Sequence, residues 1–313
     1  MHSETEQLLA TLELLGSSSF VWETATQDEF NIWNLMISEG FVNLTDIELA
    51  FKHWQNIEKW GTPTNQQEFY EYAPPRSERK DNTWNESIAN ERLGYYQQLQ
   101  QLAENHLQNI QAYNLSVPKA AHQYFEWEHP YFSVSIVVGE TSDRHYFCLA
   151  PTIPDQVSYN YRDRNQATTQ IVYEESPSEA PQTLITEVQI LLNNLTPITN
   201  YGYYHGGYNY TYQHQIVGAL AKTKTTAIEL ALQAATMVFL EKRTVEYADG
   251  RYNSRKLNQF MNQCLHNRTD YSISFWDVDY TYEVGQTPAG DWIGVRCLRR
   301  AVTPSQGEFE YNP

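Results

Sequence analysis

Apolar residues recur at helical spacing in several segments of the chain. The first segment follows a capping box at Ser3-x-x-Glu6 and carries leucines at positions 8, 9, 12 and 15. The longest pattern covers residues 84–108, with one apolar stripe that includes Ile88, Leu99 and Leu107. The same spacing predicts further helices at residues 45–54, 182–193, 226–240 and 254–265.

Stretches that alternate between apolar and polar residues, or are rich in β-forming residues, predict the strands. In the first half they cover residues 20–22, 31–36, 131–138 and 144–149. In the second half they cover residues 168–173, 201–205, 208–216, 271–284 and 291–299. Glycine-containing turns join several of these strands into antiparallel hairpins.

The periodic pattern loosens in the middle of the chain, where proline, serine and glutamate predominate. We therefore predict a linker at residues 156–181, between one domain at 1–155 and a second at 182–305. Both halves show helix, strands, helices and a closing hairpin, and Val138-Gly139-x-Thr141 matches Val284-Gly285-x-Thr287. The sequence thus predicts an internal duplication and an α+β fold: two tandem α-β-α sandwich domains, each a small antiparallel sheet with helices packed on it.

The charge of the chain is strongly negative, with a formal net charge of −17. Residues 1–155 carry 8 basic and 22 acidic side chains, whereas residues 156–313 carry 13 and 16. Direct binding to nucleic acid or to an anionic membrane is disfavoured, because neutralising phosphates requires clustered cations. The acidic surface either keeps the protein soluble or steers a partner protein that has a basic face.

The sequence offers few signals of cellular targeting. No apolar stretch approaches the roughly 20 residues of a membrane span, and the N-terminus has neither a basic region nor a small-residue cleavage site. The three cysteines, Cys148, Cys264 and Cys297, are far apart and predict neither a disulfide framework nor a zinc site. We expect a soluble, cytoplasmic protein.

Motifs of common enzymes are missing from the sequence. It has no HExxH, GxSxG, P-loop or GxGxxG pattern, and we expect no catalytic residue, metal or cofactor. Cys264-x-His266 pairs a thiol with an imidazole, but Cys264 lies on the apolar stripe of its helix. The cluster Glu126, Glu128 and His129 fits either an acid/base or metal site or a solvated strand edge.

Tyrosines are concentrated at residues 201–212, around the turn His205-Gly206-Gly207. Alternate rings can pack beneath helices while the others face water. Exposed tyrosines also serve as rigid anchors at protein interfaces. In that second interpretation the hairpin is a recognition loop, with Tyr204, His205 and Tyr208 as contact residues.

Three stretches, taken in their order along the chain, carry a family resemblance. They are Phe20-Val21-Trp22-Glu23-Thr24 with Glu29 and Trp33 downstream, the helix-to-strand passage at 96–115, and the closing hairpins at 137–141 and 284–290. In these stretches the chain resembles the nuclease A inhibitor family of cyanobacteria. The resemblance implies an α-β-α sandwich and tight inhibition of a sugar-nonspecific nuclease of the ββα-metal type.

The same resemblance implies a contact site after the first helix. There an acidic side chain of the family reaches into the metal site of the nuclease, and the matching position is Glu23, with Thr24 and Glu29 close by. A carboxylate is a good ligand for a hard divalent cation and can replace a scissile phosphate. The other interpretation of Glu23 is a solvated turn residue. Family members are typically single domains, and residues 200–212 of the second half have no carboxylate.

Three hypotheses follow from the sequence. The first is a non-enzymatic acidic protein-binding protein that inhibits a nuclease with a basic, metal-containing cleft. The second is a duplicated scaffold or regulatory binding module of the same fold without a nuclease target. The third is an enzyme of unrecognised type. Neither of the first two involves direct contact with nucleic acid or a membrane.

Overall fold

The computed structural model describes most of the chain. It covers residues 1–15, 18–60, 86–118, 133–152, 170–174, 179–195, 198–202, 207–242, 255–275, 278–300 and 311–312. Side chains are described over slightly shorter ranges, which exclude residues 56–60, 179–181, 198–202 and 207–214 among others.

Strands form two large sheets and one small one. Sheet A has the order β1 (Ser19–Trp22), β13 (Trp292–Arg300), β12 (Val278–Gln286), β11 (His266–Phe275) and β10 (Val238–Lys242), with β14 (Tyr311–Asn312) also pairing with β13. Sheet B has the order β2 (Val42–Thr45), β3 (Gln108–Ser116), β4 (Ser133–Glu140), β5 (Tyr146–Pro151), β9 (Ile216–Ala221) and β6 (Ile171–Tyr173). Strands β7 (Ile198–Gly202) and β8 (Gly207–His214) pair with each other.

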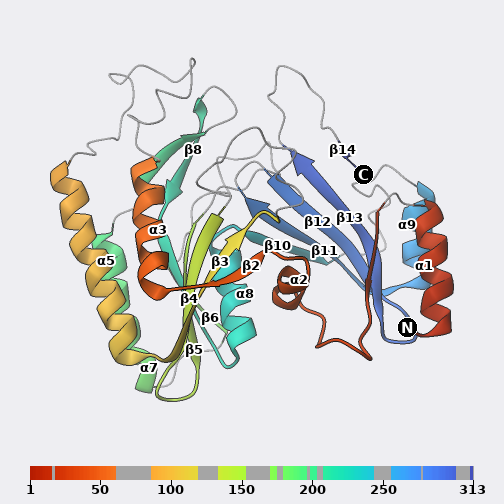
Figure 1. The fold of residues 1–313 in the computed structure, drawn as a ribbon, viewed down its shortest axis with the longest axis horizontal. Coiled ribbons are helices and arrows are strands. Elements are labelled where there is room, and N and C mark those ends of the chain that lie inside the picture. Colours follow the sequence, from red (N-terminus) through yellow and green to blue (C-terminus); the bar gives the residue numbers. More distant parts are fainter. Residues whose placement is uncertain are drawn as a thin grey trace.

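Helices cover both faces of each large sheet, so the molecule is layered (Figure 1). Helices α3 (Ile47–Trp60), α5 (Glu86–His106) and α7 (Glu179–Asn194) pack on the outer face of sheet B. Helices α1 (Ser3–Leu15) and α9 (Arg255–Cys264) pack on the outer face of sheet A. Between the sheets, α2 (Ile32–Ser38) and α8 (Lys224–Ala234) share the largest core. The predicted α+β class with helices on sheets is confirmed.

Each large sheet contains strands from both halves of the chain. Strand β1 pairs antiparallel with β13, with Ser19 opposite Val295 and Trp22 opposite Trp292. In the other direction, β9 pairs with β5, with Tyr146 opposite Ala221. Strand β1, from residues 1–155, thus belongs to sheet A, and strand β9, from residues 182–305, belongs to sheet B. Whether these two ranges are separate domains stays a prediction.

The two sheets repeat the same geometry in detail. The strand order β1-β13-β12-β11-β10 in sheet A corresponds to β9-β5-β4-β3-β2 in sheet B. Asn109 and Asn267 both have positive φ at a bulge near the start of β3 and β11. A Cβ on Gly139 would lie 2.7 Å from Leu107 Cβ, and one on Gly285 would lie 2.7 Å from Leu265 Cβ. These repeats support an internal duplication, which stays a prediction.

The strand predicted at residues 31–36 is wrong, because this segment forms helix α2. Asn31 is its N-cap, and its side-chain oxygen accepts a hydrogen bond from Asn34 N at 2.8 Å. Four of the next five side chains are apolar and all four are buried, so their periodicity does not separate helix from strand. The hydrogen bond of the Asn31 cap favours the helix over a strand.

The single strand predicted at residues 271–284 is also wrong. It consists of β11 and β12, which are antiparallel neighbours with Phe275 opposite Val278. The segment alternates with period two on both sides of this point, and it contains no glycine or proline there to mark a turn. Helix α8 is capped by Thr223, whose side-chain oxygen accepts a hydrogen bond from Thr226 N. It therefore begins at residue 224 and ends at residue 234, whereas the sequence predicted a helix over residues 226–240.

Candidate functional site

The predicted contact residues Glu23, Thr24 and Glu29 lie in one loop between β1 and α2. We call residues 23–30 the acidic loop, because it carries the carboxylates of Glu23, Asp28 and Glu29. Thr24, Asp28 and Glu29 are exposed, whereas Glu23 is partly buried and Phe30 is buried. The loop therefore presents acidic side chains to solvent beside an aromatic residue that enters the core.

Backbone and side-chain hydrogen bonds fix the shape of this loop. The N–H groups of Thr26 and Gln27 donate to Glu23 O at 3.2 and 3.0 Å. Trp22 Nε1, at the end of β1, donates to Asp28 O at 2.9 Å. Asn34 Nδ2, in the first turn of α2, donates to Glu29 O at 2.8 Å. The far end of the loop is thus tied to β1 and α2 through its own carbonyl oxygens, whereas the bonds to Glu23 O close a turn within the loop.

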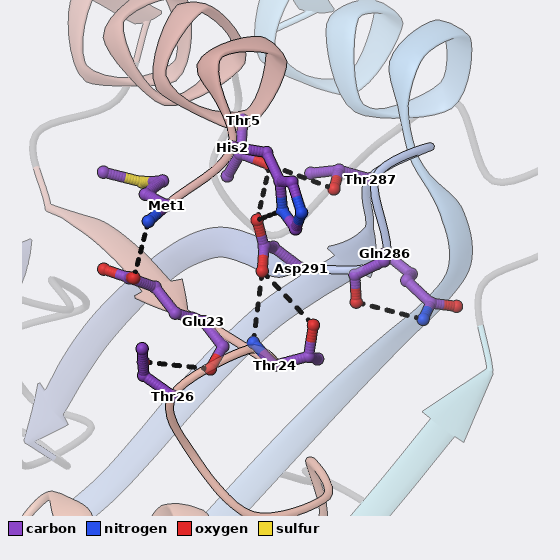
Figure 2. Close-up of polar contacts among 10 residues, drawn as sticks. Met1, His2, Thr5, Glu23, Thr24, Thr26, Gln286, Thr287 and Asp291 are labelled. Carbon is purple, nitrogen blue, oxygen red and sulfur yellow. Dashed lines mark hydrogen bonds and ion pairs between the residues drawn. The ribbon is translucent and has the colours of Figure 1, made fainter.

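A fully buried carboxylate, Asp291, ties the loop to sheet A and to α1 (Figure 2). Its Oδ1 accepts hydrogen bonds from Thr24 N at 3.1 Å and from Thr24 Oγ1 at 3.3 Å. Its Oδ2 accepts from Thr5 Oγ1 at 2.8 Å and lies 2.9 Å from His2 Nδ1. Asp291 ends the turn between β12 and β13, so this one side chain joins three segments of the chain.

Hydrogen bonding keeps the Asp291 carboxylate ionised despite its burial. Burial alone would raise its pKa, because the charged form loses its hydration. The hydrogen bonds from His2, Thr5 and Thr24 act in the opposite direction and are stronger, so the pKa falls to about 2. The buried anion is therefore compensated by donors from every segment that it joins.

The carboxylate of Glu23 contacts a cation at the same corner of the molecule. Its Oε2 lies 2.9 Å from the Met1 amino group, and this contact raises the pKa of that group. Asp291 and Glu6 raise the same pKa through their charges. The corner is therefore an acidic environment in which a partly exposed carboxylate accepts an ammonium group (Figure 2).

Glu229 of α8 supports the far end of the loop from the core side. Its Oε1 accepts a hydrogen bond from Ile32 N, at the start of α2, at 3.1 Å. Burial raises the pKa of Glu229, while hydrogen bonds from the backbone of Ile32 and Trp33 oppose this shift. The acidic loop thus runs between two carboxyl groups, the buried Asp291 at its start and the partly buried Glu229 at its end.

None of the other predicted contact residues has a described side chain. Tyr204 and His205 lie outside the described part of the chain, and Tyr208 belongs to β8, where only the backbone is described. The pairing of β7 with β8 agrees with the expected hairpin. Figure 1 places β8 beside sheet B and the acidic loop beside sheet A, so the two predicted contact segments belong to different parts of the molecule.

The weaker candidates for chemistry gain no support from the structure. Glu126, Glu128 and His129 fall outside the described residues. Cys264 packs against the small core beneath α1 and α9, and His266 is exposed. Burial raises the pKa of the Cys148 thiol. Within the described ranges, no group of three or more His, Cys, Asp or Glu side chains is placed to hold a metal ion.

An open groove of about 340 Å³ lies between α5 and α7, on the outer side of sheet B. His106 Nε2 and Glu187 Oε2 approach to 3.3 Å across it. Its remaining lining is mixed, with amide and aliphatic side chains: Gln98, Gln101, Leu102, Asn105, Ile190 and Leu191. Sheet B lies between these two helices and α2, at which the acidic loop ends (Figure 1).

Sequence reasoning missed the polar face of sheet A as well as Asp291. On β11 and β12, Asp270 lies opposite Glu283 and Ser272 opposite Thr281, and all four are buried. Glu283 forms a buried ion pair with Arg268. These polar residues alternate with the core residues Tyr271 and Tyr282. The alternation could have predicted a polar face of sheet A, once the segment had been divided into two strands.

Comparison with known proteins identifies no relative of this chain. Neither a protein-family model, nor a curated protein sequence, nor a solved structure matches the chain. Among the helices that the structure describes, none is both long and apolar enough to span a bilayer.

Proposed function

We propose that the protein is a non-enzymatic, cytoplasmic, acidic protein-binding protein that inhibits a sugar-nonspecific, metal-dependent nuclease or a related partner. The acidic loop is the observation that carries this proposal. It combines exposed carboxylates at Asp28 and Glu29 and a partly exposed one at Glu23 with a backbone tied at both ends. A loop that is ordered before binding loses less conformational entropy when a partner docks.

The chemistry of the loop fits a cationic cleft. Carboxylates can ligate a hard divalent cation or pair with the arginine and lysine side chains that bind phosphate in a nuclease. The pairing of the Glu23 carboxylate with the Met1 ammonium group supports a role of this side chain in binding a cation. The net charge of −17 favours fast, salt-sensitive association with a basic partner.

The test is inhibition of a ββα-metal nuclease by the purified protein at low and moderate salt. We expect Glu23→Gln, Asp28→Asn and Glu29→Gln to weaken inhibition, each by about tenfold or more if the carboxylate is buried at the interface. Glu104→Gln is the matched control, because Glu104 is an exposed acid on α5 in the outer helical layer of sheet B.

Two outcomes decide against this proposal. If the wild-type protein leaves digestion unchanged at micromolar concentration, this nuclease is not the target. If the loop variants and Glu104→Gln weaken inhibition equally, the effect comes from net charge and not from the acidic loop.

A second candidate function keeps the fold and drops the nuclease: a duplicated scaffold or regulatory binding module. The repeated strand order of the two large sheets favours it, because a repeat offers two related surfaces to partners. In that case capture of partners from the cell's own lysate should persist at moderate salt. It should depend on the β7–β8 hairpin and not on the acidic loop.

A further inference from the structure

The two oxygens of Asp291 hold two different segments. Both bonds to Oδ1 come from Thr24, in the acidic loop, whereas the contacts to Oδ2 come from Thr5 and His2, at the start of α1. The carboxylate therefore connects the loop to the helix without a direct hydrogen bond between Thr24 and Thr5. Each oxygen can be examined separately by removing one hydroxyl group.

The equivalent turn in sheet B does not carry this connection. The turns at residues 141–145 and 287–291 have matching backbone bonds, with Thr141 N donating to His145 O and Thr287 N to Asp291 O, both at 2.7 Å. His145 thus takes the place of Asp291, and its ion pair is with Asp143 of the same turn, at 2.9 Å. In sheet B the segment that corresponds to the acidic loop is the short connection from β9 to α8 at Lys222 and Thr223.

We propose that Asp291 is the positioning residue of the acidic loop. It holds Thr24, and with it the adjacent Glu23, in the conformation that a partner meets, although Asp291 is fully buried and touches no partner. This inference rests on the proposed function of the acidic loop. The ordering of the loop, however, can be measured without any partner.

Thr24→Val and Thr5→Val form a matched pair of variants. Each removes one hydroxyl donor to Asp291 and replaces it with a methyl group of similar size, but on opposite oxygens. Hydrogen exchange of the Gln27 amide, which donates to Glu23 O, reports the order of the loop. Inhibition of the ββα-metal nuclease, measured across salt concentrations, reports binding.

We expect Thr24→Val to speed exchange at Gln27 and to weaken inhibition, each by about tenfold, because a hydrogen bond to a charged group is lost. The salt dependence of inhibition should stay that of the wild type, since no charge at the interface changes. Thr5→Val should lower the melting temperature while leaving Gln27 exchange and inhibition unchanged. Asp291→Asn should speed exchange at Gln27, weaken inhibition and also lower the melting temperature.

Equal effects of Thr24→Val and Thr5→Val on Gln27 exchange would overturn the proposal, because Asp291 would then act only through overall stability. Unchanged exchange in Asp291→Asn would overturn it as well. If the wild-type protein does not inhibit the nuclease, the proposed function fails, whereas the exchange measurements still decide whether Asp291 orders the loop. Asp143→Asn, at the equivalent turn of sheet B, should leave the acidic loop unaffected.

Discussion

At the scale of the residue, Asp291 shows how a buried charge can contribute to the fold. Its carboxylate is fully buried, and such burial is unfavourable unless donors compensate for the lost water. Thr5, His2 and Thr24 supply these donors from segments near the opposite end of the chain. The contribution of Asp291 to stability therefore depends on the carboxylate being ionised.

This dependence leads to a prediction for acid pH. The pKa of Asp291 is about 2 in the folded protein, below the ordinary value of 3.8. Because the folded pKa is the lower one, the carboxylate contributes its full stabilisation above about pH 4 and loses it as the pH falls towards 2. Ionisation of this group therefore favours the folded state, and its protonation at low pH favours unfolding.

Urea unfolding of the wild type and of Asp291→Asn between pH 2 and pH 7 measures this contribution. The difference in unfolding free energy should be constant above about pH 5 and shrink progressively below pH 4. A difference that remains constant down to pH 2 would contradict the prediction.

Sequence reasoning found the acidic loop but not the residue that holds it. Glu23, Thr24 and Glu29 were singled out by the family resemblance, and because they lie within seven consecutive residues the sequence already places them close together. Asp291 is 267 positions away from Thr24, and nothing in the local sequence of a glycine-containing turn indicates its partner. The roles of the three loop residues in binding stay a prediction.

At the scale of the element, glycines mark where a strand passes close to the end of a helix. Gly139 of β4 lies against Leu107, just after α5, and Gly285 of β12 lies against Leu265, just after α9. A Cβ in either place would lie 2.7 Å from the Cβ of the leucine, closer than the two atoms can approach. Glycine is therefore required at both positions by packing.

We predict that Gly139→Ala destabilises the protein by about 1–3 kcal/mol, because β4 or the α5–β3 connection must move away. Gly94→Ala is the control: it lies within α5, its Cβ would meet no atom within 4 Å, and alanine favours a helix. This second change should leave stability unchanged or raise it by up to about 1 kcal/mol. Thermal unfolding of both variants tests the pair, and equal destabilisation would refute the packing argument.

The longest helical patterns predicted their elements well, although the pattern at residues 226–240 covers helix α8 and the start of strand β10. The helices expected at residues 84–108, 182–193 and 254–265 correspond closely to α5, α7 and α9. Helix α2 was missed because four of its first five side chains are apolar and buried, so no periodicity separates helix from strand. The division between β11 and β12 was missed because no glycine or proline marks the turn.

At the scale of the whole molecule, the exchange of β1 and β9 makes each large sheet depend on both halves. The sequence could not predict this exchange, because both halves end in similar hairpins and period alone does not say which hairpin β1 joins. The pairing is instead settled by tertiary packing, in which Phe20 contacts Tyr282 with ring centroids 5.8 Å apart.

We predict that residues 1–160 and 161–313, produced separately, do not form folded monomers. The first fragment lacks β13 as the partner of β1 and β9 as the partner of β5, and the second lacks the complementary strands. Mixing the two fragments should restore a folded one-to-one complex, measured by circular dichroism and by size-exclusion chromatography with light scattering. A folded monomer of residues 1–160 would contradict the prediction and favour two independent tandem domains.

The pairing of β1 with β13 also sets an order of events on the ribosome. Trp22 can pair with Trp292 only after about 270 more residues have been synthesised. Their synthesis takes roughly 14–54 seconds at 5–20 residues per second. During this interval the amino-terminal helix and strand have no sheet to join. Asp291 is synthesised just before Trp292, so the acidic loop acquires its anchor only after residue 291 has been added. We therefore expect a chain truncated before Asp291 to lack the ordered loop and, with it, the proposed inhibition.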